Sequence, residues 1–122
     1  MANWVLEDSG QHVAPSEVRQ LLVDRVNEGR LWTHFRTDSG QALMFVSNGD
    51  RAMVVFLKHE GDAGEHAVDP GAAGESTGFV LDNGQVDTYS DRDTVPLMRA
   101  VKAVEQVLTA GHRPSDHWQD DR

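Results

Sequence analysis

A hairpin followed directly by one amphipathic helix occupies the last third of the chain and constrains the fold more than any other segment. Two runs that favour strands, residues 77–81 and 85–89, flank the turn Asp82-Asn83-Gly84. The apolar residues of the helix recur at i, i+4, i+7 and i+11, as Leu97, Val101, Val104 and Leu108. Because such a stripe has to be buried, we expect this helix to pack against a sheet.

The sheet itself is predicted from the middle of the chain. Residues 31–36 alternate between apolar and polar, whereas residues 42–46 and 52–57 are almost wholly apolar. The turns Asp38-Ser39-Gly40 and Asn48-Gly49-Asp50 separate these runs, so we expect an antiparallel three-strand meander. The two apolar runs indicate central strands with both faces covered, and the alternating run suits a position nearer an edge.

These elements define the predicted fold class. Apolar periodicity places the two helices at Ser16–Glu28 and Pro96–Ala110. The chain is therefore predicted to be α+β, with a mainly antiparallel sheet of about five strands, formed by the meander and the hairpin, packed by two helices. At 122 residues, 39% of them hydrophobic, and with no linker that marks a boundary, residues 1–122 are expected to form a single domain.

Residues 58–76 are the least regular part of the sequence. Five residues interrupt any periodicity: Gly61, Gly64, Pro70, Gly71 and Gly74. We therefore expect a long surface loop here, and loops of this length in compact domains are usually functional or mobile. A binding role is best sought first in this segment.

Negative charge is concentrated in the same part of the chain. The sequence has 20 acidic residues against 11 Lys and Arg, a net charge of −9. Residues 59–93 contain nine of these acids and a single cation, Arg92, which accounts for all but one unit of the excess. A field of this sign repels phosphate groups, so we expect no direct nucleic-acid or anionic-membrane binding, and a basic protein partner instead. A purely solubilising role for the acidic loops is the open alternative.

One segment matches a catalytic motif. Gly74-Glu75-Ser76-Thr77-Gly78 fits the G-x-S-x-G pattern of a hydrolase nucleophile elbow, with His112 and His117 downstream. That elbow needs a strand before the serine and a helix after it, because the strained turn between them exposes the hydroxyl. Here a Gly/Ala loop precedes and a strand is predicted to follow. We therefore expect no catalytic residue and keep a small hydrolase that uses Ser76 as a less favoured alternative.

A second segment gathers groups that bind metal ions. Between His59 and His66 lie three carboxylates, those of Glu60, Asp62 and Glu65. The zincin motif requires its second histidine four residues after the first on a helix, and here that position is Ala63. Without cysteine there is no thiolate zinc site and no disulfide. We expect no metal and no cofactor, although the sequence leaves open whether this loop binds a divalent cation.

The sequence also bears on location. Its longest apolar runs fall far short of the roughly 20 residues that a membrane-spanning helix needs. The first eight residues lack the basic region and apolar core of a secretory signal. A cytoplasmic protein is therefore expected, and the sequence predicts no particular oligomeric state.

The order of the predicted elements and the C-terminal tail resemble a known family. The residues that carry the likeness are 41–57, 78–89, 95–111, Arg113-Pro114 and Trp118. They resemble the first-numbered family of immunity proteins in bacterial polymorphic toxin systems, over most of the chain after Gly29. Tails in that family commonly place an acid two residues after the Trp, where this chain has Asp120.

The resemblance implies an α+β domain that binds and neutralises a cognate toxin in the cytoplasm of the producing cell. Such toxins are often nucleic-acid-modifying enzymes such as deaminases. The charge agrees, because an acidic protein can occlude a basic active site. We expect the partner-binding residues to be Glu60, Asp62, Glu65, Asp82, Asp87, Tyr89, Asp91, Asp93 and Trp118. An acidic adaptor or regulatory domain that binds a protein other than a toxin is the main alternative.

Overall fold

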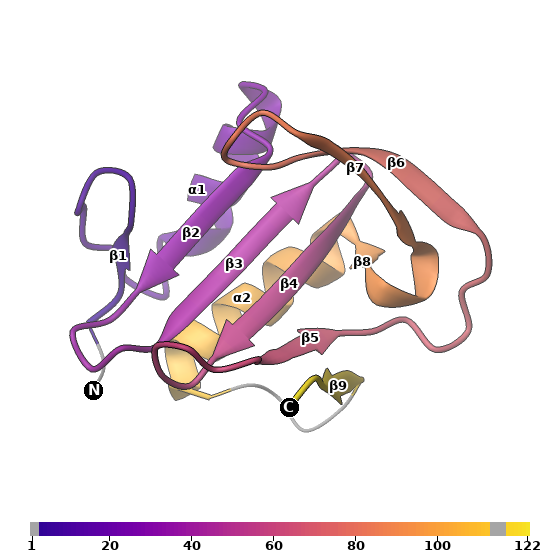
Figure 1. Ribbon diagram of the computed structural model, residues 1–122. Coiled ribbons are helices and arrows are strands. Elements are labelled where there is room, and N and C mark those ends of the chain that lie inside the picture. Colours follow the sequence, from indigo (N-terminus) through magenta and orange to yellow (C-terminus); the bar gives the residue numbers. More distant parts are fainter. Residues whose placement is uncertain (1–2, 113–116) are drawn as a thin grey trace.

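The computed structural model describes residues 3–112 and 117–122, and its largest element is one antiparallel sheet (Figure 1). The strands of this sheet are β1 Val5–Leu6, β2 Trp32–Arg36, β3 Ala42–Ser47, β4 Arg51–Leu57, β5 Glu65–Ala67, β8 Val95–Pro96 and β9 Trp118–Asp120. They run in the order β1-β2-β3-β4-β5-β9, and β8 pairs with β4. The remaining elements are α1 Val18–Asn27, β6 Glu75–Val80, β7 Val86–Ser90, the short 3₁₀ helix η1 Asp91–Asp93, and α2 Leu97–Ala110.

Strands β2, β3 and β4 form the predicted meander, and local turn chemistry closes it. The side-chain oxygen of Asn48 accepts hydrogen bonds from the backbone N–H groups of Asp50 and Arg51, at 2.9 and 2.7 Å. Gly49, which follows Asn48 in this turn, has a φ of 92°, a conformation that favours glycine. The backbone N–H of Thr37 donates to the carbonyl of Gln41 at the other turn, at 3.0 Å. These turns fix a register in which alternate residues share a face of the sheet.

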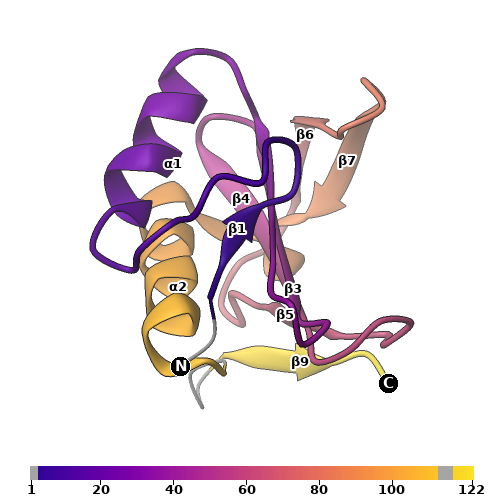
Figure 2. The same ribbon diagram turned by 90° about the vertical axis from the view of Figure 1, so that its left-hand side faces the viewer.

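Both helices pack on one face of the sheet, and the core lies between the helices and that face (Figure 2). Three phenylalanines of the meander are fully buried there: Phe35, Phe45 and Phe56. The stripe predicted on α2 is confirmed for Val101, Val104 and Leu108, which are buried, while Leu97 is partly buried at the edge of the core. No helix in the described part of the chain is long and apolar enough to cross a bilayer.

The α+β fold class and both helices are confirmed, with α1 two residues shorter than predicted at its start and one at its end, and α2 one residue shorter at its start. The hairpin is confirmed as well, but β6 and β7 form a two-stranded sheet of their own instead of extending the main one. Figure 2 shows this hairpin on the side of the sheet opposite α1 and α2. It therefore faces the surface of the sheet that the helices leave open.

The prediction of an irregular loop over residues 58–76 is wrong in part. Residues 65–67 form β5, which pairs with β4 on one side and with β9 on the other. A strand of three residues is too short to show alternation in the sequence, and its first residue, Glu65, resembles a surface acid. Pairing with distant strands, rather than local periodicity, makes this segment a strand.

The prediction that the apolar strands are covered on both faces is also wrong. The inward residues of β4, Ala52, Val54 and Phe56, are buried under the helices. The outward residues Met53 and Val55 are only partly buried, because two helices in this chain cover only one face. An open, apolar sheet face remains.

Candidate functional site

The open face of the meander, called here the outer face, is organised in rows across the strands. The register sets Trp32, Val46 and Met53 opposite one another in the row nearest the hairpin. The middle row consists of His34, Met44, Val55 and His66, from β2, β3, β4 and β5. Val46 is buried, and the other members are partly exposed. The outer face thus has an apolar middle with an imidazole on each flank.

The first of these imidazoles, His34, lies at the β2 side. Its Nδ1 is 3.6 Å from a carboxylate oxygen of Glu7, whose side chain is 58% exposed. The ring of Trp32 is its aromatic neighbour, with centroids 5.3 Å apart. This flank therefore presents an acid to solvent beside an aromatic pair.

The second imidazole, His66, is held between two carboxylates. Its Nδ1 lies 2.7 Å from Asp121, and its Nε2 lies 3.0 Å from Asp93. Burial lowers the pKa of His66, but hydrogen bonds to the two carboxylates outweigh that effect, so the pKa is raised above its ordinary value. A protonated His66 therefore ties β5 to η1 and to the C-terminal end of the chain.

The β6–β7 hairpin is anchored on the outer side of the sheet by an aromatic pair. Phe79 is fully buried where β6 lies beside β3, and its ring is 5.0 Å from that of Tyr89. The hydroxyl of Tyr89 donates to Asp87 at 2.9 Å, and burial together with this carboxylate raises the pKa of Tyr89 to about 12. The side chain of Asn48 donates to the carbonyl of Thr77 at 3.1 Å, which fixes the hairpin to the β3–β4 turn.

Arg51 holds the base of this hairpin. Its guanidinium donates to the Thr94 hydroxyl at 2.8 Å, to Asp69 at 2.9 Å and to the backbone carbonyl of Asp91 at 2.9 Å. The hydrogen bond from Arg51 lowers the pKa of Asp69. The carboxylate of Asp91 in turn accepts a hydrogen bond from Ser76 at 2.5 Å. Asp91 is therefore part of the scaffold beneath the hairpin.

Some of the residues expected to contact a partner are exposed or partly exposed, and others have buried side chains. Glu60 and Asp82 are exposed, while Asp87, Tyr89 and Asp93 are partly exposed around the outer face. Glu65 is 2% exposed, and its carboxylate lies 3.2 Å from Arg122 and 3.7 Å from Lys58, so little of it is open to a partner. The side chain of Asp62 is likewise 2% exposed, since both of its oxygens accept hydrogen bonds from Arg122, a contact that lowers the pKa of Asp62.

Trp118 docks back onto its own domain. It pairs with Ala67 in the β5–β9 ladder, is partly buried, and packs against the core. It also lines a cavity of about 240 Å³ together with Val68 and Arg99. Trp118 is therefore a structural anchor rather than a free contact residue, and Arg113-Pro114 of the same tail lies outside the described residues.

The structure gives no support to a nucleophile elbow at Ser76. This residue lies inside β6, so no helix follows it, and its hydroxyl is bonded to Asp91. The His59–His66 segment likewise lacks the geometry of a metal site. His66 directs both ring nitrogens at carboxylates, and among the described residues no group of three or more His, Asp or Glu could hold a metal ion.

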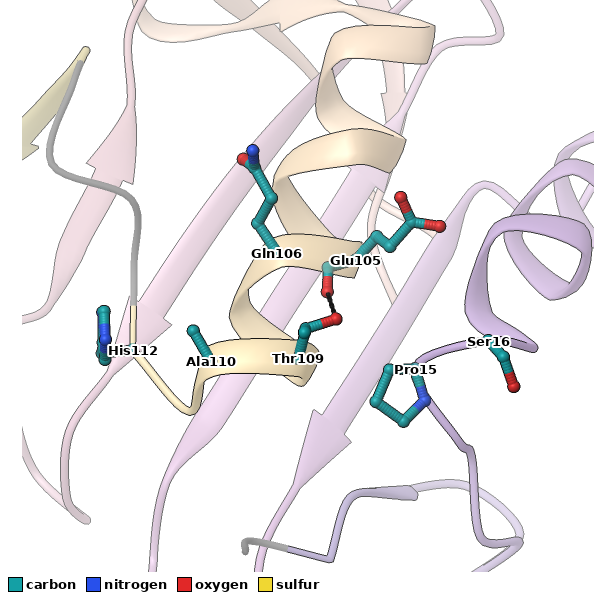
Figure 3. A pocket seen from close by; sticks show the side chains of 7 residues that line it. All are labelled: Pro15, Ser16, Glu105, Gln106, Thr109, Ala110 and His112. Carbon is teal, nitrogen blue, oxygen red and sulfur yellow. Dashed lines mark hydrogen bonds between the residues drawn. The ribbon is translucent and has the colours of Figure 1, made fainter.

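A cavity of about 600 Å³ lies on the helical side of the molecule, between the segment before α1 and the last turns of α2 (Figure 3). Its lining residues are Pro15, Ser16, Glu105, Gln106, Thr109, Ala110 and His112. The hydroxyl of Thr109 donates to the backbone carbonyl of Glu105 at 2.8 Å, so it is engaged within the helix. The side chains of Glu105 and His112 point away from each other, so these two residues do not form an acid–base pair with one another.

No family model matches this chain, and no curated protein or solved structure is significantly similar to it. The function is therefore argued from the surface. Sequence reasoning missed the outer-face residues Met44, Met53 and Val55. One signal in the sequence could have found them. The two central strands are apolar on both faces, but the chain has only two predicted helices, which suffice to cover one face of the sheet.

Proposed function

We propose that this protein is an immunity-type inhibitor that binds a basic toxin, such as a nucleic-acid-modifying deaminase, and blocks its active site. The observation that carries the proposal is the charge of the hairpin. Residues 75–90 contain Glu75, Asp82 and Asp87 and no Lys, Arg or His. This segment stands on the side of the sheet opposite the helices, where it is open to a partner (Figure 2).

The physical argument concerns the substrate groove of such a toxin. An enzyme that acts on DNA or RNA presents basic groups to phosphates, and carboxylates placed in the same groove compete for them. Opposite charge also accelerates the encounter of the two proteins. Occlusion of this kind requires no catalytic group on the inhibitor.

The test uses Glu75 and Asp82 of the hairpin, because both are exposed, whereas Asp87 accepts a hydrogen bond from Tyr89. Asp91 and Asp93 are unsuitable, since Asp91 accepts from Ser76 and Asp93 contacts His66. We expect the double variant Glu75→Lys/Asp82→Lys to associate on the order of ten times more slowly with the protein encoded by the neighbouring open reading frame, and with a weaker salt dependence. Stopped-flow association at low and moderate salt measures both quantities.

A matched control variant carries the same change of charge at two exposed acids outside the hairpin. Glu28 follows α1 and Asp38 lies in the β2–β3 turn, and both are exposed. Glu28→Lys/Asp38→Lys should slow association much less, and wild type should protect cells that express the neighbouring protein. If wild type neither binds nor protects, the proposal fails and an adaptor role is favoured. If both double variants behave alike, the hairpin has no special part in binding.

A further inference from the structure

We infer that the toxin covers the outer face of the sheet, with Met44, Met53 and Val55 at the centre of the contact. This inference rests on the proposed function and names the surface that performs it. It also specifies the partner: a surface with an apolar centre ringed by lysine and arginine side chains.

First, the outer face has the residue composition of a surface that is covered by another protein. When one face of an antiparallel sheet meets solvent, its residues are usually polar. Here the outward residues of β3 and β4 include Met44, Val46, Met53 and Val55. Contiguous apolar surface of this kind marks sites of association. Methionine side chains are flexible and polarisable, so they adapt to the shape of a partner.

Second, the part of the chain that the structure describes covers the two ends of this face and leaves its middle partly exposed. At one end Phe79 and the hairpin shield Val46, which is buried. At the other end Gly64 lies so close to Leu57 that a Cβ atom at Gly64 would clash with it. Met44 lies between these ends, and Met53 stands opposite Val46 in the row nearest the hairpin; both remain partly exposed.

The third argument is the charge around the face. Glu7 stands beside His34 on one flank, and Asp93 and Asp121 stand beside His66 on the other. Asp87 contributes a carboxylate from the hairpin. Arg36, in the row farthest from the hairpin, is an exposed cation of this face. Arg92, 3.7 Å from Asp93, is a second cation of the rim, and a protonated His66 is a third. The four carboxylates still outnumber the three cations, so the rim is negative on balance, which favours a basic occupant.

The same charges disfavour a second copy of this chain as the occupant. Two copies, each with a net charge of −9, would bring their acidic hairpins and rims together. Like charges juxtaposed across an interface oppose association. A partner of opposite charge satisfies the apolar centre and the acidic rim at once.

The experiment places a charge in the centre of the face and uses a matched methionine as control. Met44→Lys and Met53→Lys are compared with Met98→Lys, since Met98 is 49% exposed on α2, on the other side of the molecule. Met44→Gln separates the loss of apolar contact from the added charge. Each purified variant is titrated calorimetrically against the protein encoded by the neighbouring open reading frame, and circular dichroism and urea midpoints confirm that it folds.

We expect Kd to rise about 30-fold or more for Met44→Lys and Met53→Lys, less for Met44→Gln, and under about 3-fold for Met98→Lys. If wild type binds and the outer-face variants bind equally well, this inference is overturned while the proposed function stands. If wild type binds no such protein, both fail. If sedimentation shows a wild-type dimer that Met44→Lys dissociates, the occupant is a second copy and the inference is wrong.

Discussion

His66 is a residue whose protonation is coupled to the fold. Its imidazole faces Asp121 from the C-terminal end and Asp93 from η1, and Arg92 lies 3.7 Å from Asp93 on the same side. Burial lowers the pKa of His66, but the hydrogen bonds to the two carboxylates outweigh that effect, so its pKa in the folded protein is above its ordinary value. The imidazolium is therefore favoured by folding.

Stability should accordingly fall as pH rises. A group whose pKa is raised by folding contributes stability that is fully present below its unfolded pKa and is lost as pH rises through the folded pKa. Urea unfolding is measured for wild type and His66→Gln from below the unfolded pKa of His66 to above its folded pKa. The free energy of unfolding should fall more with rising pH in wild type than in the variant. His59→Gln, at an exposed histidine, is the control and should follow wild type. Parallel profiles for wild type and His66→Gln would mean that folding leaves the pKa of His66 unchanged.

The acidic residues show why site prediction from sequence was incomplete. Asp62 resembles a surface charge, but its partner Arg122 is 60 positions away, and the partner of Asp69, Arg51, is 18 positions away. No local pattern signals such pairs. Asp82, in contrast, lies at a turn between two strand-forming runs, and turns of that kind are exposed for reasons that act locally.

At the scale of elements, the helices and the meander were predictable because their signals act over short windows. Apolar stripes mark α1 and α2, and Asn48 with Gly49 marks the β3–β4 turn. Strands β5 and β9 were not predictable, since each has three residues and each forms by pairing with distant segments. Which face of the sheet the helices choose is likewise a tertiary property. The open outer face followed from that choice.

The hairpin is the element whose attachment matters most for the proposed binding. Two strands alone are marginally stable in water, so β6 and β7 depend on the burial of Phe79. Phe79→Ala should weaken this attachment by about 3 kcal/mol, which corresponds to roughly 100-fold faster amide exchange in residues 75–90. Exchange in α2 should change far less.

Hydrogen–deuterium exchange with mass spectrometry measures both effects, and Val86→Ala is the control within the hairpin. Val86 is 60% exposed, so its truncation should leave exchange nearly unchanged. Equal acceleration in residues 75–90 and in α2 would show that Phe79 supports the whole fold rather than the hairpin.

At the scale of the whole molecule, the two sides of the sheet have different roles. One side carries α1, α2 and the core between them, and the other carries the acidic hairpin and the outer face (Figure 2). We assign the stability of the fold to the first side and propose that the second side binds the partner. Evolution of the binding side can then proceed with little effect on the core, because the two sets of side chains point in opposite directions from the same strands.

Comparison of amide exchange in the free protein and in its complex with the protein encoded by the neighbouring open reading frame tests this assignment most directly. The account predicts slower exchange in residues 75–90 on binding, since the hairpin borders the covered face and is the less stable sheet. Exchange in α1 and in α2, including residues beside the cavity between Pro15 and Ala110, should be unchanged. Protection confined to the helices, with residues 75–90 exchanging as in the free protein, would contradict it.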